Sequence, residues 1–343
     1  MDLRATPVAE PPRAACPPVA AALALFNAWQ RDLPLVPRPF DALGAPHALS
    51  GGQVRALLQQ GIANGQVSRI GGTFGTGAGG AAMLCALSVP PADLARVAGL
   101  VNAEPGVNHN YAREHEWNLW FVVTATDVAK LIAVVDRIER ETGLRALRLP
   151  MRRAYRIDLG FDLFDGPRAA TAVARRAGRP AAEVTPALRP LAARLECGLP
   201  LVERPFAALG EPLAIAEAEV IATLRAWCDS GTLRRLGVVL RHHEFGFAAN
   251  AMTVFDVPAD EADALGTRLA AQAGVTLCYR RAAAPGWPYT LYCMVHGRER
   301  AAVQRLIDEA TRAAGLAGRP RQVLFSTERF KQTGSRYFAE AIA

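Results

Sequence analysis

The chain has 343 residues, of which 51% are apolar, and its 39 Lys and Arg against 32 Asp and Glu give a formal net charge of +7. This length is too great for one ordinary core and predicts more than one domain, and the apolar content excludes a disordered chain. No apolar run reaches the roughly 20 residues that span a bilayer, so we expect a cytoplasmic protein without a membrane segment.

The cysteines and arginines give further information about the compartment and the ligands of the protein. The six cysteines occur singly, without a CxxC pair or closely spaced histidines. That spacing disfavours structural zinc and a disulfide framework and is typical of core side chains in a reducing compartment. Lys130 and Lys331 are the only lysines, so nearly all the positive charge is arginine. An arginine surplus suits nucleic acid or a small polyanion such as a polycarboxylate.

Three helices are expected in the first part of the chain. Residues 1–17 are rich in Pro and Ala and predict a flexible tail. An apolar helix at 18–31, a short helix after the LPLVPRPF turn and an amphipathic helix within 49–67 follow. Three helices and a short hairpin predict a winged helix-turn-helix domain at 18–80.

The next part alternates strands and helices. MLCALSVP at 83–90, a helix at 91–103, a strand-rich stretch, a helix at 127–143 and ALRLPMRRAYRI at 146–157 follow one another. The order β-α-β-β-α-β predicts a ferredoxin-like domain at 81–165.

The predicted pair of a winged-helix and a ferredoxin-like domain occurs twice in the chain. LPLVPRPFDALG at 33–44 recurs as LPLVERPFAALG at 199–210. Internal repetition predicts a tandem duplication, with a second winged-helix domain at 166–246 and a second ferredoxin-like domain at 247–343, joined near FDGPR at 164–168. We therefore predict an α+β fold of two homologous halves that pair their ferredoxin-like sheets.

The stretch VNHNYAREHEWNLWFVV at 107–123 is the first candidate site. If it is extended, His109, Tyr111, Arg113 and His115 share one face, because strand side chains alternate. Two imidazoles and a guanidinium beside indoles predict a pocket wall that offers acid, cation and aromatic groups. The alternative is a polar hairpin loop that leads into a core strand.

The second half supplies arginines flanked by apolar or aromatic residues, namely Arg234, Arg235, Arg241, Arg280 and Arg281. Buried guanidiniums need anionic partners, and carboxylates match their geometry, so we expect ligand contacts here. The alternative is that these are ordinary surface arginines.

The two copies differ at the candidate site. The second copy has Leu277 and Ala283 in place of the two histidines, but it keeps Tyr279 and Arg281. We therefore predict one composite pocket between the halves, with the histidines on one side and the arginines of the second copy on the other. The alternative adds a degenerate second pocket.

DNA binding is not expected, although the predicted domain class often binds DNA. The helix at 215–228, the counterpart of a recognition helix, exposes Glu217 and Glu219. Acids that face a phosphate backbone are unfavourable.

Long strings in the chain resemble a known family. In the first half, HNYAREHEWNLWFVV resembles the A-type subunit of the sirohaem decarboxylases. Three strings of the second half resemble the B-type subunit: RRLGVVLRHHEFGFAANAM (234–252), CYRRAAAPGWPYTLYCMVHG (278–297) and LFSTERFKQTGSRYF (324–338). The domain order resembles that of the Lrp/AsnC group of regulators. The chain after its tail is similar to the sirohaem decarboxylases of the fused D–L type, which belong to haem d1 biosynthesis.

This resemblance implies an activity. A carboxy-lyase of this kind removes the acetate carboxylates at C12 and C18 of sirohaem without oxidation, giving 12,18-didecarboxysirohaem. No cofactor is implied, since the iron belongs to the substrate. A second homologous subunit pair and self-association through the ferredoxin-like domains are the implied partners. The alternative is an Lrp/AsnC-like regulator that senses a tetrapyrrole or binds DNA.

Roles follow for the candidate residues. We predict His109 and His115 as proton donors or carboxylate-orienting groups, and Arg113 as the group that holds the departing acetate. His242 or His243 would alternatively ligate the sirohaem iron, with His242 as the first candidate. The predicted substrate contacts are Tyr111, Trp117, Asn118, Arg234, Arg235, Arg241, His242, His243, Tyr279, Arg280, Arg281, Trp287 and Tyr289.

Overall fold

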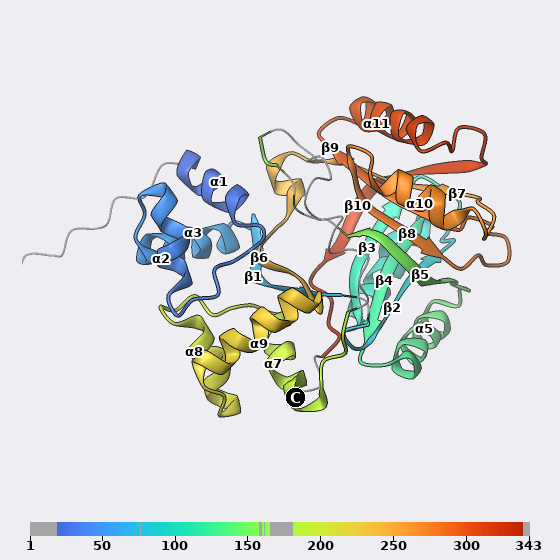
Figure 1. The fold of residues 1–343 in the computed structure, drawn as a ribbon. Coiled ribbons are helices and arrows are strands. Elements are labelled where there is room, and N and C mark those ends of the chain that lie inside the picture. Colours follow the sequence, from blue (N-terminus) through green and yellow to red (C-terminus); the bar gives the residue numbers. More distant parts are fainter. Residues whose placement is uncertain (1–18, 76, 158–159, 161, 165–180, 339–343) are drawn as a thin grey trace, which may run out of the picture.

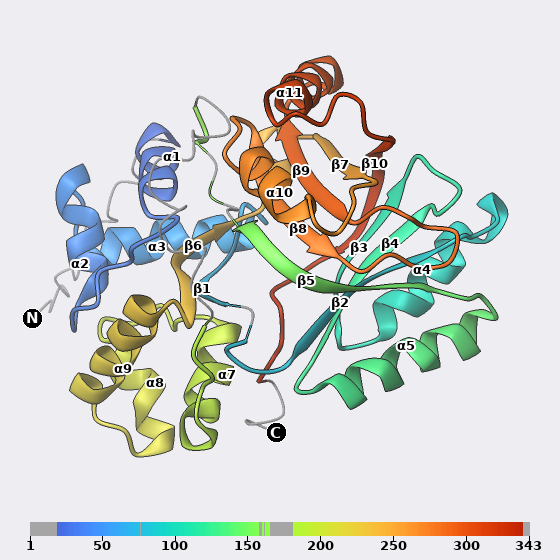
Figure 2. The ribbon, with the colours of Figure 1, turned by 45° about the vertical axis from the view of Figure 1, so that its right-hand side comes forward.

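The computed structural model describes residues 19–75, 77–157, 160, 162–164 and 181–338. The predicted tail at 1–17 and most of the predicted join at 164–168 lie outside these residues. A helical part and a barrel flanked by helices lie side by side, with two strands between them (Figures 1 and 2). No helix in the described ranges is long and apolar enough to cross a membrane.

The helical part repeats one order of elements. The first half supplies α1 (Val19–Ala28), α2 (Pro39–Gly44), α3 (Gly51–Ala63) and strand β1 (Val67–Phe74), and the second supplies α7 (Arg189–Cys197), α8 (Pro205–Gly210), α9 (Glu217–Ser230) and β6 (Leu233–Leu240). Helix α3 begins after Ser50, whose hydroxyl accepts the N–H of Gln53 while the Gln53 side chain accepts the Ser50 N–H. This capping box satisfies donors that a helix start leaves open. Both sets of helices share one apolar core, which includes Phe40 and Phe206.

The predicted hairpins of the two winged-helix domains are wrong. Strand β1 pairs antiparallel with β6 of the other half, and Gly71 lies opposite Gly237. A Cβ at Gly237 would lie 2.6 Å from the backbone carbonyl of Gln30, so only glycine admits the main chain that follows α1. Strands β1 and β6 each pair with a strand of the other half. In each half the helical part is followed by a single strand before the chain enters the barrel, so the described residues hold no second strand of the same half that could form a hairpin.

The barrel contains eight strands. Its closed order is β10-β3-β4-β2-β5-β8-β9-β7. The strands of the first half are β2 (Ala81–Leu87), β3 (Val107–Arg113), β4 (Leu119–Ala125) and β5 (Leu147–Ile157), and those of the second are β7 (Ala249–Phe255), β8 (Val275–Arg281), β9 (Leu291–Gly297) and β10 (Arg321–Gln332). Strand β5 pairs with β2 and β8, and β10 pairs with β7 and β3. The predicted pairing of the two sheets is thus confirmed, through the last strand of each half.

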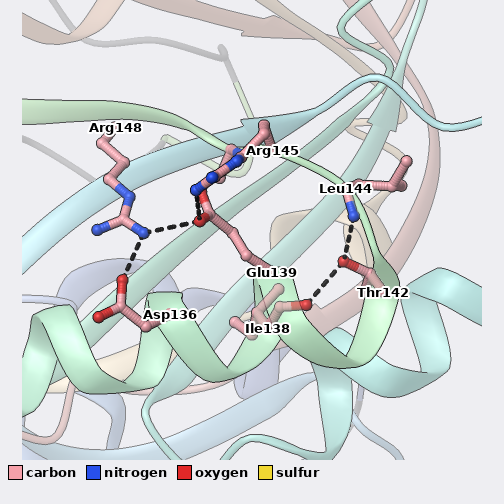
Figure 3. A network of polar contacts seen from close by, with 8 residues as sticks. Asp136, Ile138, Glu139, Thr142, Leu144, Arg145 and Arg148 are labelled. Carbon is pink, nitrogen blue, oxygen red and sulfur yellow. Dashed lines mark hydrogen bonds and ion pairs between the residues drawn. The ribbon is translucent and has the colours of Figure 1, made fainter.

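Four helices cover the outside of the barrel: α4 (Leu94–Ala103), α5 (Val128–Thr142), α10 (Ala262–Ala270) and α11 (Arg300–Ala313). Both halves therefore follow the order β-α-β-β-α-β. Figure 3 shows how α5 is tied to β5: the Arg148 guanidinium lies 2.6 Å from Asp136 and 3.0 Å from Glu139, which Arg145 also contacts. These partly exposed pairs add little stability, and helix position depends on buried Leu131 and Val135.

The barrel interior is filled only in part. Trp120, Trp287 and Tyr292 pack with aliphatic side chains from both halves in one inner cluster. The Trp287 indole N–H donates to the Tyr292 hydroxyl at 2.7 Å, which satisfies both buried groups. The remaining interior, on the side of β1 and β6, is a cavity.

Candidate active site

The cavity has a volume of about 390 Å³. All eight barrel strands contribute to its lining, together with β1, β6, the turn that begins at Arg241 and the segment after β10. Its lining is formed by both halves, as the prediction of a composite pocket requires. Such a volume lies within the range of ligand pockets.

Strand β3 behaves as its sequence predicts up to Arg113. His109, Tyr111 and Arg113 all line the cavity, because alternate side chains of the strand point into the barrel. The strand ends at Arg113, and His115 lies in the turn that follows. Its ring packs edge-on against Trp287 with ring centroids 5.3 Å apart, and its Nδ1 accepts the N–H of Trp117 at 3.0 Å. The prediction that His115 shares this face is wrong.

Strand β8 presents the equivalent face of the second half. Leu277, Tyr279 and Arg281 line the cavity. Arg280 alternates to the other side of the strand, where it contacts Asp263 at 3.3 Å. The prediction of Arg280 as a substrate contact is therefore corrected to an ion pair outside the cavity.

Arg113 and Arg281 are the two deeply buried cations of the cavity, with 6% and 8% of their surface exposed. Each donates one hydrogen bond to a backbone oxygen, to Leu324 and to Leu149 respectively, at 2.9 Å. Within the described residues, neither has a carboxylate partner, and the Nε of each has no acceptor. Burial lowers the pKa of Arg113 to about 10 and also lowers the pKa of Arg281. A buried guanidinium without an anion is costly, so both positions suit an incoming carboxylate.

Strand β6 and the turn after it carry further cavity cations. Arg235 donates to the backbone oxygens of Gln30 at 2.7 Å and Val238 at 2.8 Å, and burial lowers its pKa to about 9. Arg241, His242 and His243 also line the cavity, with His242 buried and His243 exposed. Arg234 does not line it, so this predicted contact is corrected.

Several cavity residues were missed by the sequence analysis: Arg69, Glu196, Asn250, His296, Arg329 and Tyr337. Arg69 could have been found, because the repeat aligns it with Arg235. His296 follows Met294 on the inward face of β9, so strand alternation also pointed to it. Glu196 and Tyr337 come from α7 and from the segment after β10, and no local pattern indicated that they meet.

The imidazoles of His109 and His296 on the barrel strands have lowered pKa values. Burial, with a contribution from the Arg69 charge, lowers the pKa of His109 to about 4. Burial and then the Arg113 charge lower the pKa of His296 to about 3, and its Nδ1 lies 2.9 Å from the Thr276 hydroxyl. A bound polyanion favours the charged form of an imidazole and therefore raises its pKa. A polyanion bound in this cavity would therefore favour protonation of both imidazoles.

Three of the predicted aromatic contacts and the predicted amide contact lie behind the cavity rather than on it. Trp117, Trp287 and Tyr289 belong to the inner cluster, and of the aromatic residues in that cluster only Trp120 lines the cavity. The Asn118 side chain holds the backbone of Val89, accepting its N–H at 2.9 Å and donating to its carbonyl at 2.8 Å. These four predicted substrate contacts are corrected to structural roles.

Metal ligation by the protein alone has no support in the part of the chain that the structure describes. No group of three or more His, Cys, Asp or Glu side chains there could hold a metal ion. An iron carried by a ligand would need only one side chain, and His242 and His243 are the imidazoles at the turn after β6.

Comparison with known proteins gives the family. A model described as "AsnC-like ligand binding domain" matches residues 78–156 and 244–331, and one described as "Siroheme decarboxylase NirDL-like HTH domain" matches residues 189–234. The "Siroheme decarboxylase NirDL subunit" of Paracoccus denitrificans is 46% identical over 91% of this chain and 96% of its own length. The "Siroheme decarboxylase NirL subunit" of Stutzerimonas stutzeri is 48% identical over 42% of this chain and 85% of its own length.

A solved structure agrees with this. A crystal structure of the siroheme decarboxylase NirDL in complex with an iron-uroporphyrin III analogue superposes with a TM-score of 0.66 at 28% identity, over 94% of this chain and 95% of that one. The chain therefore belongs to the NirDL family of sirohaem decarboxylases.

Proposed function

We propose that the protein removes the C12 and C18 acetate carboxylates of sirohaem, giving 12,18-didecarboxysirohaem for haem d1 biosynthesis. The observation that carries this proposal is the pair Arg113 and Arg281, two buried guanidiniums without carboxylate partners among the described residues, on opposite halves of one cavity. Sirohaem is a macrocycle with several carboxylates. Buried cations that lack anions gain most from such a ligand.

The reaction needs a carboxylate out of water and a proton for the carbon left behind. The bond between the acetate methylene and its carboxylate breaks, CO2 leaves, and the electron pair stays on the methylene carbon. That carbon takes one proton and becomes a methyl group. We assign the proton to His109, which lies beside Tyr111 with ring centroids 6.1 Å apart. Arg113, two residues further along the same face, orients the departing carboxylate.

Binding itself prepares His109. With a pKa near 4 it is neutral in the free protein, and neutral imidazole is a poor proton donor. The negative charge of the bound substrate raises this pKa, so the imidazolium forms where the proton is needed. The bound substrate also displaces water from the cavity, which favours loss of the carboxylate charge.

His242 is the proposed ligand of the sirohaem iron. It is buried at the start of the turn that follows β6 and lines the cavity. The iron is part of the substrate, and no other cofactor enters the proposal.

The organisation of the chain belongs to the same proposal. We infer that a tandem duplication produced the halves, with boundaries near 18–80, 81–165, 166–246 and 247–343, in a cytoplasmic protein. The repeated order of elements and the separate NirL subunit, which covers less than half of this chain, support it. A second homologous subunit pair and self-association through the barrel remain part of the proposal.

The alternative is an Lrp/AsnC-like regulator, whose ligand-binding domain the barrel resembles, but the start of α9 disfavours DNA binding. Glu217 and Glu219 occupy the first turn of α9, and Glu217 is paired with Arg204. An acidic helix start repels phosphate.

The test is anaerobic incubation with iron-loaded sirohaem, followed by mass spectrometry of the extracted pigment. We expect loss of two CO2 by the wild type, no loss by His109→Ala with pigment still bound, and turnover by His115→Ala. His115 is the matched control because it is a histidine six residues away that lies outside the cavity. Tight binding without mass loss by the wild type would refute an enzyme that works alone and leave a pigment-binding protein or one half of a larger complex.

A further inference from the structure

One wall of the cavity is not part of a sheet. Strand β10 ends at Gln332, and the chain then continues along the cavity as residues 333–338 without regular structure. Thr333, Gly334, Ser335 and Tyr337 line the cavity. The barrel strands and the pair β1–β6 are held by hydrogen-bond ladders instead.

A second hollow lies on the outer side of this segment. It is a groove of about 680 Å³, lined by the glycine-rich turn that includes Gly77, the start of α5 and residues 337–338. Tyr337 lines both the groove and the cavity. The segment is therefore the wall that separates them. A Cβ at Gly80 would lie 2.9 Å from the Cβ of Tyr337, so this wall rests directly on the glycine backbone.

Two side chains, Glu196 and Phe338, tie the end of this segment to the helical part. The Glu196 carboxylate of α7 accepts the N–H of Tyr337 at 2.9 Å and the N–H of Phe338 at 3.0 Å. The Phe338 ring packs on Phe74 with centroids 5.0 Å apart. Glu196 is 7% exposed, and the charged or titratable groups around it are Arg69 on β1, Arg336 and Tyr337 on the segment, and Cys197 beside it on α7.

The size of the cavity points to a moving wall. Its 390 Å³ is at the small end of ligand pockets, which run from roughly 300 to 1,000 Å³. A macrocycle with carboxylate arms would fill this space, so a wall that yields would ease its entry and release. Opening a barrel strand breaks a ladder on both sides. Residues 333–338 lie outside these ladders, so opening them costs the backbone hydrogen bonds of Thr333 and Arg336 to β3 and β4 and exposes the buried Phe338 ring.

We propose that residues 333–338 form a strap that swings toward the groove to admit and release the macrocycle, and that Glu196 is the positioning residue that holds the strap closed. This proposal rests on the proposed function for the identity of the ligand. The strap and its carboxylate latch do not depend on the chemistry of decarboxylation.

Binding kinetics separate a latch from a binding contact. Glu196→Gln replaces one accepting oxygen by an amide group that cannot accept the second N–H. With an iron-uroporphyrin as the probe in stopped-flow absorbance, we expect the association and dissociation rate constants of this variant both to rise by roughly tenfold, with little change in Kd. Phe338→Ala loosens the same strap without touching a charge and should act in the same direction. Glu203→Gln, an exposed carboxylate paired with Arg38, is the matched control and should leave both rates unchanged.

Hydrogen exchange tests the strap without any pigment. In the free protein, we expect the amides of 333–338 to exchange at least about tenfold faster in Glu196→Gln than in the wild type, while β3 and β8 stay protected. Equal exchange in the two proteins would overturn the latch. A rise in the dissociation rate alone would make Glu196 a ligand contact and overturn the gating role. If the wild type takes up no pigment while the exchange result holds, the proposed function fails and the strap stands.

Discussion

Arg113 and Arg281 each reach across the junction between the two halves and donate to a backbone oxygen of the other half, Leu324 and Leu149, both at 2.9 Å. Each guanidinium also lies over a tyrosine two residues before it, at 5.7 Å from the Tyr111 centroid and 5.3 Å from the Tyr279 centroid. Two related cations are therefore fixed on opposite walls of one cavity. The surroundings differ, because His109 in the first half is replaced by Leu277 in the second.

Removal of either buried guanidinium should weaken pigment binding. Arg113→Met and Arg281→Met keep most of the side-chain volume but remove the charge that a carboxylate would meet. We expect the affinity for an iron-uroporphyrin to fall by roughly tenfold or more in each, measured by absorbance titration. Arg280→Met is the control, since Arg280 pairs with Asp263 outside the cavity. A loss in the control as large as in Arg281→Met would contradict the assignment.

Pigment binding should take up protons. The pKa of His109 is about 4 in the free protein, so its imidazole is neutral at pH 6. The bound polyanion raises that pKa, and the affinity therefore falls as pH rises through the pKa of the complex. Titration calorimetry at pH 6 in buffers of different ionisation enthalpy should show net uptake. His109→Leu, which copies the residue of the second half, should show less, and equal uptake in both would exclude His109 as the group.

Stability should depend on the protonation of Glu196. Burial raises the pKa of its carboxyl to about 7 from an ordinary value of 4.5, so the folded protein binds this proton more tightly than the unfolded chain does. Stability from this group is therefore full below about pH 4.5 and is lost as pH rises to about 7, by at most roughly 3 kcal/mol. Urea unfolding at pH 5 and pH 8 measures the difference. In Glu196→Gln, the difference in the free energy of unfolding between the two pH values should become smaller. An unchanged difference would assign the pH dependence to another group.

Two glycines, one crowded in β6 and one open in α4, should respond to alanine with opposite changes in stability. A Cβ at Gly237 would lie 2.6 Å from the carbonyl of Gln30, and this backbone cannot move away cheaply. We expect Gly237→Ala to lower the free energy of unfolding by about 1–3 kcal/mol. Gly99 in α4 has nothing within 4 Å of its Cβ position, so Gly99→Ala should raise it by about 0.5–1 kcal/mol. Denaturant unfolding of both variants checks the signs, and a tolerated Gly237→Ala would show that β6 can move away from α1.

Local periodicity was enough for part of the site. Strand alternation correctly placed His109, Tyr111 and Arg113 on one face, because the direction of a strand side chain depends only on its own backbone. The same rule separates Arg280 from Tyr279 and Arg281, although the sequence analysis grouped them. The prediction for His115 was wrong because the strand ends two residues earlier, at Arg113, and the alternation of side chains does not reveal where a strand ends.

The sequence by itself determined the repeat, the β-α-β-β-α-β order of each half and the inward face of β3, since all three depend on neighbours along the chain. Only the tertiary structure decided that β1 pairs with β6, that β5 and β10 join both halves into a barrel, and that Glu196 meets the segment after β10. The sequence of a strand does not reveal which other strand it pairs with, because every backbone offers the same hydrogen-bond donors and acceptors. The packing of both halves around one interior selects among them, and that choice is what brings Arg69, Arg113 and Arg281 to a single cavity.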